Sequence, residues 1–231
     1  MLMSGNDYRE SLRRYSPRVF INGDRIESVA DEPRVAPGIA AVGVTYDFAL
    51  DERYRHLMTA EYRANGTTVN RMLHIDEEPQ DLLSKLEATR LVCRESGCAQ
   101  RYLTHDAINA IHQATYQLDD ATNGNYHQRF LAYLDLVHSK DLTLGVAMTD
   151  GKGDRSLRPS DQPNPDSYVH IKTRRKDGIV IRGAKAIITG APYMHELLVM
   201  PCRNMTEDDT DYAVCCAVPI DADNLTIVAR P

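Results

Sequence analysis

The spacing of hydrophobic residues divides the chain into a helical first part and a β-rich second part. Between residues 33 and 138, apolar side chains recur every three or four positions, which is the period of an amphipathic helix. Predicted helices cover residues 6–14, 39–50, 82–100, 106–118 and 126–137. Ahead of the longer helices, residues 18–26 form a predicted β-hairpin, because the Asn22-Gly23 pair suits a type I′ turn.

Past residue 141 the pattern changes to the alternation of polar and apolar positions that is typical of β-strands. Predicted strands cover residues 142–144, 168–172, 179–181, 197–200, 212–218 and 225–229. The loop over residues 150–166 contains Pro159, Pro163 and Pro165 and is long enough to be either functional or merely mobile.

These elements predict an α+β fold in two domains. A helical N-terminal domain, with its hairpin, is expected over residues 1–140, and a middle β domain over residues 141–231. The β domain is expected to be partial, because the chain finishes on a strand and nothing follows to cover the sheet. We therefore expect a truncated product.

Composition and charge exclude several classes of protein. With 231 residues, 42% of them hydrophobic, the chain can bury a real core. Its apolar runs are far shorter than the ~20 residues of a membrane helix, and the N-terminus lacks the long apolar core of a signal peptide. We therefore expect a soluble, cytoplasmic protein with no membrane partner. A net charge of −6 argues against a nucleic-acid partner, and five cysteines without paired Cys-x-x-Cys spacing are expected to be reduced thiols.

Two segments carry the strongest chemical signal. Residues 146–155 end an apolar strand in a polar, Gly-rich turn, and residues 177–190 form an alternating hairpin that brings Thr189 to a strand end. Both could offer hydroxyls and backbone N–H groups to a planar ligand. The alternative is an ordinary strand end and an ordinary Gly-Lys-Gly-Asp turn, which are common without any ligand.

Three histidines are weaker candidates. His105 and His112 are seven residues apart, two helical turns along one face, and Asp106 stands beside the first, so a metal or acid–base site can be built from them. Partly exposed helix residues account for the same spacing and are the favoured interpretation. His195 opens the strand after Thr189 and could approach the candidate site, but we assign it no proton-transfer role.

Four pairs of segments carry a resemblance to a known family. They are Tyr8-Arg9-Glu10-Ser11-Leu12 with Arg18-Val19, Met148-Thr149-Asp150 with Lys152-Gly153-Asp154-Arg155, Asp177-Gly178-Ile179-Val180 with Arg182-Gly183-Ala184-Lys185-Ala186, and Asp211-Tyr212-Ala213-Val214 with Asp221-Ala222-Asp223. With these segments the chain resembles the N-terminal half of the flavoprotein family that contains 4-hydroxyphenylacetate 3-hydroxylase and 4-hydroxybutyryl-CoA dehydratase. The residue identities within the segments favour the dehydratase branch. The resemblance implies an acyl-CoA-dehydrogenase-like fold whose C-terminal helical bundle is missing here.

The resemblance also implies a cofactor and site residues. FAD is the implied cofactor, held by the first segment and by a hydroxyl near the reactive edge of the ring. The implied cofactor-binding residues are Met148, Thr149, Lys152, Asp154, Arg155 and Thr189. Arg101 and Tyr102 are the implied substrate-binding residues; their alternative interpretation is a surface ion pair and a half-buried aromatic side chain.

One departure from the dehydratase pattern concerns an iron–sulfur cluster. The resemblance implies two cluster cysteines one helical turn apart, with one His and one Cys from the missing half. Cys98 matches the first cysteine, but Tyr102 stands at the second position, on the same predicted helix face. Cys93 is a poor substitute because five helical residues rotate it ~140° from Cys98. We therefore expect FAD without an iron–sulfur cluster and no metal ligands.

The function that this resemblance favours is an FAD-dependent monooxygenase, similar to 4-hydroxyphenylacetate 3-hydroxylase and represented by its N-terminal half. The first alternative is a lyase similar to 4-hydroxybutyryl-CoA dehydratase, also named a vinylacetyl-CoA isomerase. The second is a non-catalytic fragment that needs a partner chain. The expected partners are a small-molecule substrate, either a phenol or an acyl-CoA, and either further copies of the chain or a separately encoded C-terminal half.

Overall fold

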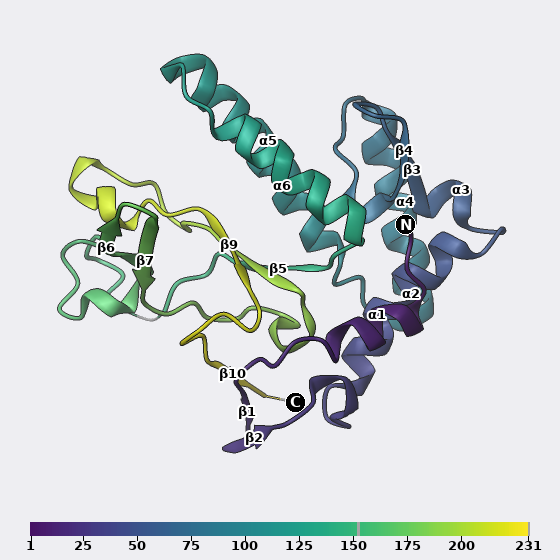
Figure 1. The fold of residues 1–231 in the computed structure, drawn as a ribbon, viewed down its shortest axis with the longest axis horizontal. Coiled ribbons are helices and arrows are strands. Elements are labelled where there is room, and N and C mark those ends of the chain that lie inside the picture. The colour runs from purple at the N-terminus through teal and green to yellow at the C-terminus, as the bar shows by residue number, and fades with distance from the viewer. Residues whose placement is uncertain (152, 231) are drawn as a thin grey trace.

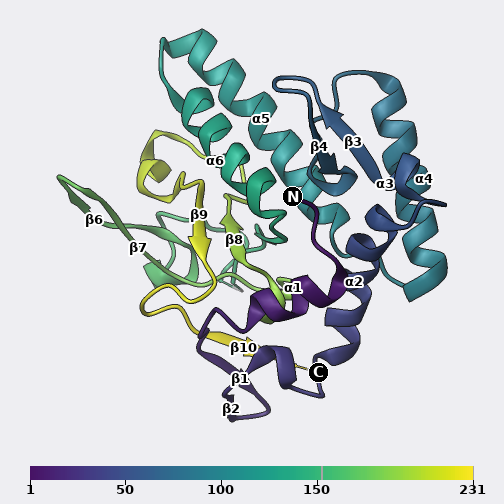
Figure 2. The same cartoon turned by 45° about the vertical axis from the view of Figure 1, so that its right-hand side comes forward.

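The computed structural model describes residues 1–151 and 153–230, and it contains both helices and short β-sheets. Figure 1 shows the helices on one side of the molecule, the later strands on the other side, and the strands near both termini at the lower edge. In the view turned by 45°, β8 and β9 lie below the helices α5 and α6 and above α1 and β10 (Figure 2). The predicted mixture of helices and sheets is confirmed.

The predicted helices are present with shifted ends. They are α1 (Gly5–Leu12), α2 (Ala36–Leu50), α4 (Pro79–Ser96), α5 (Tyr102–Thr122) and α6 (Tyr126–Lys140), together with the short α3 (Arg55–Met58) that was not predicted. Helix α1 begins at a capping box, in which the Ser4 side chain accepts from the Asp7 backbone N–H and the Asp7 side chain accepts from the Ser4 backbone N–H. Helices α5 and α6 form a hairpin that extends away from the rest of the chain (Figure 1).

The predicted end of the third helix, at residue 100, was wrong. Helix α4 ends at Ser96 because Gly97 takes the left-handed conformation, with φ of 70°, that terminates helices. Cys98 therefore lies in the link between α4 and α5, and the expectation that it shares a helix face with Tyr102 was also wrong. The ~140° rotation assumed between Cys93 and Cys98 fails for the same reason.

A second β-hairpin was missed inside the part of the chain that was read as helical. Strands β3 (Thr59–Tyr62) and β4 (Thr67–Asn70) pair antiparallel, and Gly66 between them has φ of 70°. The Asn65-Gly66 pair and the β-branched run of β4 were the available signals. The predicted hairpin near the N-terminus is confirmed: β1 (Val19–Ile21) and β2 (Asp24–Ile26) flank Asn22 and Gly23, which both have positive φ.

The second part of the chain contributes a three-stranded sheet and a separate hairpin. Strand β5 (Leu144–Ala147) pairs parallel with β8 (Glu196–Val199), and β8 pairs antiparallel with β9 (Cys216–Pro219). The hairpin consists of β6 (His170–Arg175) and β7 (Gly178–Arg182), and its basic end is exposed. The strand predicted over residues 212–218 was too long, because a 3₁₀ helix occupies Glu207–Tyr212.

The last strand is paired with the first. Strand β10 (Ile227–Ala229) runs parallel to β1, so the end of the described chain joins the N-terminal hairpin in a three-stranded sheet. One buried cluster contains Tyr8 and Ile21 from the beginning of the chain together with Leu197 and Ile227 from its end. Strand β10 is thus an edge strand of the sheet that contains the N-terminal hairpin. The proposed division at residue 140 stays a prediction.

Two further clusters complete the core. In the first, α5 and α6 pack with Leu144 and Leu198 of the three-stranded sheet, and in the second, α2 packs against α4. No helix among the described residues combines the length and the apolar character needed to cross a membrane. The cysteines at positions 93, 98, 202, 215 and 216 are free thiols, as expected.

Candidate functional site

The two segments that carried the chemical signal in the sequence lie side by side. Strand β5 ends at Ala147, and the next residues turn toward the segment that follows β7. The Ala186 backbone N–H donates to the Thr149 carbonyl at 2.9 Å, and Asp150 and Lys185 form an isolated antiparallel bridge. The fold therefore brings together two segments that are about 35 residues apart.

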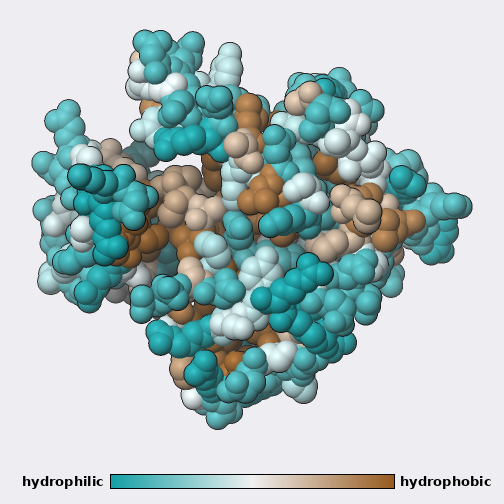
Figure 3. Space-filling model, viewed as in Figure 1, coloured by the Kyte–Doolittle hydropathy of each residue, from teal (hydrophilic) through white to brown (hydrophobic). Residues whose placement is uncertain are grey.

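The paired segments expose both apolar side chains and hydroxyls. Met148 is 42% exposed and Ile187 is 83% exposed, although both are large hydrophobic residues. Thr149 is partly exposed and Thr189 is exposed. An apolar surface with a few polar groups beside it is the usual lining of a site for a planar organic ligand. Figure 3 shows apolar residues gathered near the centre of one face of the molecule, between the α5–α6 hairpin and the β6–β7 hairpin.

Ile187 has an unusual backbone conformation. Its φ is 58°, in the left-handed region that a β-branched residue rarely adopts. Such strained positions cost about 1 to 3 kcal/mol and persist where the surrounding structure imposes them, often at functional sites. The strain at Ile187, two residues before Thr189, supports the assignment of this segment to a site.

Thr189 does not lie at a strand end, so that prediction was wrong. Strand β7 ends at Arg182, and Thr189 lies in a turn directly before the 3₁₀ helix Ala191–Tyr193. The alternating pattern of residues 184–188 misled the prediction, because these residues form only an isolated bridge at Lys185 and the positive φ of Ile187 interrupts any extended run.

The turn at Thr189 contacts the link between α4 and α5. The Tyr193 hydroxyl donates to Gln100 Oε1 at 3.0 Å. A Cβ added at Gly190 would lie 2.7 Å from the same oxygen, which shows how closely the two segments approach. The structure therefore places the predicted substrate residues, Arg101 and Tyr102, on a segment adjacent to the predicted cofactor residue Thr189.

Arg101 is completely buried, so its alternative interpretation as part of a surface ion pair was wrong. Its side chain is 0% exposed, and Nη2 donates to Asp141 Oδ1 at 2.5 Å and to the Leu142 carbonyl at 3.1 Å. The guanidinium also lies 3.9 Å from the centroid of the Tyr46 ring, in cation–π geometry. Nε and Nη1 have no hydrogen-bond partner among the described residues. The substrate-binding role of Arg101 stays a prediction.

Tyr102 and Cys98 differ from Arg101 in exposure. The Tyr102 side chain is 37% exposed at the first residue of α5, and Cys98 is partly buried. Within the part of the chain that the structure describes, no three His, Cys, Asp or Glu side chains are grouped as metal ligands. The donor set at these two positions is one thiol and one phenol.

The long loop after Thr149 is folded by its own side chains. Gln162 is buried, accepts from the Asp154 N–H at 3.0 Å and donates to the Asp154 carbonyl at 2.7 Å. The side chains of Asp154 and Arg155 are exposed, and Lys152 lies outside the described residues. The described part of the loop is therefore closed by a buried amide, and its functional role stays a prediction.

Asp209 anchors the same loop. It is 0% exposed and accepts from Arg158 Nε at 2.8 Å and from the Ser160 hydroxyl at 2.9 Å. Burial alone would raise the pKa of this carboxyl, but the hydrogen bonds from Arg158, the Thr206 N–H and Ser160 hold the pKa well below its usual range. Asp209 thus connects the loop to the 3₁₀ helix Glu207–Tyr212. This contact joins residues far apart in the sequence, so a local sequence pattern does not predict it.

His195 is a buried structural residue. The Thr143 N–H donates to its Nδ1 at 2.9 Å, so the ring proton must be on Nε2, which lies 2.7 Å from the Ser11 hydroxyl. Burial and the positive charge of Arg101 lower its pKa to about 3. Both ring nitrogens of the neutral imidazole therefore have hydrogen-bond partners. This agrees with the sequence analysis, which gave His195 no role in proton transfer.

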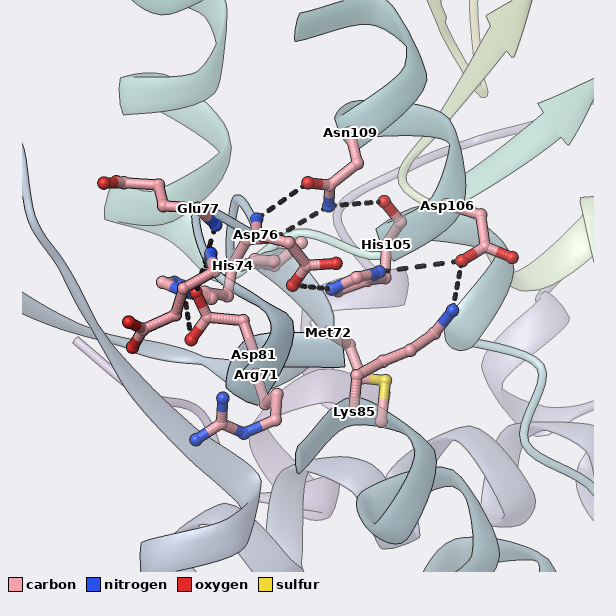
Figure 4. A network of polar contacts seen from close by, with 12 residues as sticks. Arg71, Met72, His74, Asp76, Glu77, Asp81, Lys85, His105, Asp106 and Asn109 are labelled. Atoms are coloured by element: carbon pink, nitrogen blue, oxygen red, sulfur yellow. Dashed lines mark hydrogen bonds and ion pairs between the residues drawn. The ribbon is translucent and has the colours of Figure 1, made fainter. Parts of the chain in front are cut away.

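A polar network surrounds His105, and the expectation that this residue is partly exposed was wrong. His105 is 1% exposed, and its Nε2 lies 3.1 Å from Asp76 Oδ1 (Figure 4). On its other side, Asp106 also bonds Lys85, so the network joins α4 to α5. His112 instead packs edge-on against His127, so the two histidines predicted as one site point to different neighbours. Burial lowers the pKa of His105.

A cavity of about 250 Å³ lies beside this network. Its lining includes His74, Arg71 and Asp81. Asp81 already accepts from the backbone N–H groups of Glu77 and Glu78, as in a helix cap. Positive and negative side chains are mixed in the lining, so the charge of the cavity favours neither an anionic nor a cationic ligand.

Lys185 is the residue that reasoning from the sequence missed. It was part of a recognised segment, but no role was given to it. Its side chain is only 9% exposed, and its ammonium joins Asp150 to the Met148 and Met200 carbonyls. Two residues earlier, Gly183 passes close to another segment, since its φ is +135° and an added Cβ would lie 2.2 Å from the Tyr168 carbonyl oxygen. A lysine in an otherwise alternating, partly apolar segment was the available signal.

Comparison with known proteins gives one family. Residues 4–231 match a family model described as 4-hydroxyphenylacetate 3-hydroxylase, N-terminal. A 4-hydroxybutyryl-CoA dehydratase/vinylacetyl-CoA-Δ-isomerase from Clostridium aminobutyricum is 43% identical over 99% of this chain and 47% of its own length. The oxygenase component of a 4-hydroxyphenylacetate 3-monooxygenase from Thermus thermophilus is 26% identical over 100% of the chain and 47% of its own length. The chain thus spans about half the length of these relatives.

Solved structures agree with the sequence comparison. An oxygen-tolerant archaeal 4-hydroxybutyryl-CoA dehydratase from N. maritimus superposes with a TM-score of 0.95 at 38% identity, covering 99% of this chain and 45% of that one. The oxygenase component of a 4-hydroxyphenylacetate 3-monooxygenase in complex with FAD superposes with a TM-score of 0.82 at 25% identity, covering 99% of this chain and 47% of that one. Both similarities extend over the two paired segments.

Proposed function

Because the chain belongs to the 4-hydroxyphenylacetate 3-hydroxylase family, we propose that it forms the FAD-binding N-terminal half of a flavoenzyme. The observation that carries the proposal is the pairing of residues 148–150 with residues 185–189. An FAD complex among the similar solved structures supports the same cofactor. The acyl-CoA-dehydrogenase-like fold is part of this proposal.

The residues present fit a flavin in three respects. Met148 and Ile187 offer exposed apolar side chains to the faces of a planar ring, and Thr149 and Thr189 offer hydroxyls to its polar edge. In addition, Asp150 Oδ2 is buried without a hydrogen-bond partner, as expected of an acceptor that a ligand satisfies. The loop with Asp154 and Arg155 follows directly and is the proposed contact to the rest of the cofactor.

The proposed site residues orient the flavin and control the access of water to it. A bound flavin supplies electron transfer or a reactive reduced ring, and the protein controls it through hydrogen bonds and access of water. Thr149 and Thr189 would orient the ring, and Met148 and Ile187 would exclude water from it. Arg101 would act on the substrate only through the neighbouring link, since its guanidinium is enclosed; Tyr102 is exposed and can contact a substrate directly.

The first candidate reaction is the monooxygenation of a phenol. Relatives named as monooxygenase oxygenase components support it. The replacement of a thiol by the phenol of Tyr102 supports it as well, because the chain then offers one cluster ligand at the two positions where the resemblance implies two. The monooxygenase candidate therefore requires no iron–sulfur cluster.

The second candidate is a lyase that acts on a hydroxyacyl-CoA. The specific observation in its favour is overall similarity, since the dehydratase relative is 43% identical and the monooxygenase relative 26%. The iron–sulfur cluster is therefore an open question for this chain, and its absence stays a prediction. A separately encoded C-terminal half or further copies of the chain are the proposed partners in either case.

Replacing Thr189 with valine is expected to weaken FAD binding about fivefold, because valine keeps the shape but removes a hydroxyl that contributes about 1 kcal/mol. The free energy of unfolding should change by less than about 0.5 kcal/mol, since Thr189 is exposed. Fluorescence titration with FAD measures the first quantity and urea denaturation the second. Thr173→Val, at an exposed position on β6, is the matched control; equal FAD affinities of the two variants would contradict the role of Thr189.

The two candidate reactions are separated by iron content and product. The chain is combined with its proposed C-terminal half and reconstituted under anaerobic conditions with FAD, iron and sulfide; metal analysis should then give less than about one iron per chain if the monooxygenase assignment is right. Incubation with reduced FAD, oxygen and 4-hydroxyphenylacetate should then yield the catechol product. About four irons per chain, with dehydration of 4-hydroxybutyryl-CoA and no catechol, would establish the lyase instead.

A further inference from the structure

Lys185 has an ammonium group that is enclosed by two other segments, residues 148–150 and the residue after β8. Nζ donates to the Met148 carbonyl at 3.0 Å, to the Met200 carbonyl at 2.8 Å and to the Asp150 carboxylate. The side chains of Lys185 and Asp150 are each 9% exposed. An ammonium has three N–H donors, so every donor of Lys185 has a partner.

These contacts fix how the two segments of the site lie relative to each other. Met148 and Asp150 belong to the first segment, Lys185 to the second, and Met200 follows directly after β8. The backbone bond from Ala186 to the Thr149 carbonyl is adjacent to the ion pair. A buried charge that satisfies two carbonyls and a carboxylate holds its neighbours more rigidly than a single backbone bond does.

Asp150 retains one unused acceptor. Its Oδ1 receives the Lys185 ammonium, whereas its Oδ2 is buried and has no partner among the described residues. Buried acceptors in folded proteins nearly always have a donor, and an ordered water, an ion or a ligand group can supply the donor that Oδ2 lacks. The exposed side chain of Met148, two residues before Asp150, borders the same segment.

Building on the proposed function, we propose that Lys185 is a positioning residue for the flavin, and that Asp150 Oδ2 accepts a hydrogen bond from an N–H or O–H group of the bound cofactor. Lys185 holds the first segment at the distance from the second that the cofactor requires. Asp150 connects the two roles, because one carboxylate oxygen binds the lysine and the other is the proposed acceptor.

The test compares four variants of the full chain. Lys185→Met should raise the FAD dissociation constant about tenfold or more, move the visible bands of bound flavin toward those of free flavin, and speed the exchange of the Ala186 amide hydrogen. Lys185→Arg keeps the charge and should restore part of the affinity. Lys172→Met, on the exposed strand β6, is the matched control and should behave as wild type.

Asp150→Asn tests the second role and remains decisive if Lys185→Met fails to fold. The amide keeps an oxygen for Lys185 but presents an N–H donor where the unused acceptor stood, so FAD affinity should fall about tenfold. The melting temperature should also fall, because the Lys185 ammonium loses its counter-charge, so the affinity is measured at a temperature at which circular dichroism shows the variant to be folded. An FAD affinity within twofold of wild type in Asp150→Asn, or in folded Lys185→Met with an unchanged flavin spectrum, overturns this inference alone. A wild-type chain that binds no FAD overturns the proposed function together with it.

Discussion

Substitution of Arg101 by methionine is expected to destabilise the chain by about 3 to 5 kcal/mol. The Arg101 side chain is 0% exposed and that of Asp141 2%, so the variant leaves a buried carboxylate without its counter-charge. It also removes the donor to the Leu142 carbonyl and the contact with the Tyr46 ring. For a chain of this length, the loss corresponds to a fall in melting temperature of roughly 10 °C, measurable by thermal denaturation followed by circular dichroism.

Arg174→Met is the matched control for this experiment. Arg174 forms an ion pair with Asp211 at 2.6 Å, but the two side chains are 58% and 59% exposed. Exposed pairs contribute less than about 1 kcal/mol, so the control should melt within a few degrees of the wild-type chain. If Arg101→Met melted at the same temperature as Arg174→Met, the buried pair would not have the structural importance assigned to it.

Acidification is expected to destabilise the chain through His195. Its pKa is lowered to about 3 in the folded chain from 6.5 in a model peptide, because the ring is buried and lies near the Arg101 charge. Below pH 6.5 the unfolded chain therefore binds a proton that the folded chain does not. The stabilisation is complete above pH 6.5 and is lost as the pH falls toward 3, by about 4 to 5 kcal/mol at most.

Two measurements check this prediction. The His195 ring resonances in an NMR titration should remain those of a neutral imidazole down to the pH at which the chain unfolds. Urea denaturation between pH 7 and pH 4 should show a shallower loss of stability for His195→Gln than for the wild type. His56→Gln removes an exposed imidazole as the control; a titration midpoint of His195 near 6.5 in the folded chain would contradict the account.

The residues with regular patterns gave the most reliable predictions. Helix α6 begins at the predicted residue, Tyr126, because its apolar positions repeat without a break and a polar turn precedes it. The hairpin around Asn22-Gly23 was equally predictable, since few pairs of residues accept positive φ at both positions of a turn. The resemblance implied that residues 146–155 and 177–190 serve one site, but the pairing of residues 148–150 with residues 185–186 was not predicted.

The errors came from interactions between distant parts of the chain. Arg101 looks like a surface residue in the sequence, and only the fold shows that Asp141 and Tyr46 enclose it. Strand β10 pairs with β1 over some 200 residues of sequence, which no local pattern encodes. The early end of α4 was different in kind, because Gly97 was a readable stop signal that the helical periodicity outweighed.

The most direct test of the central claim is the visible absorption spectrum of the anaerobically purified chain after incubation with FAD and gel filtration. The account predicts structured flavin bands that co-elute with the protein at about one FAD per chain, and no broad iron–sulfur shoulder. A colourless protein peak, with all FAD in the small-molecule fraction, would contradict the claim that residues 148–150 and 185–189 form a flavin site.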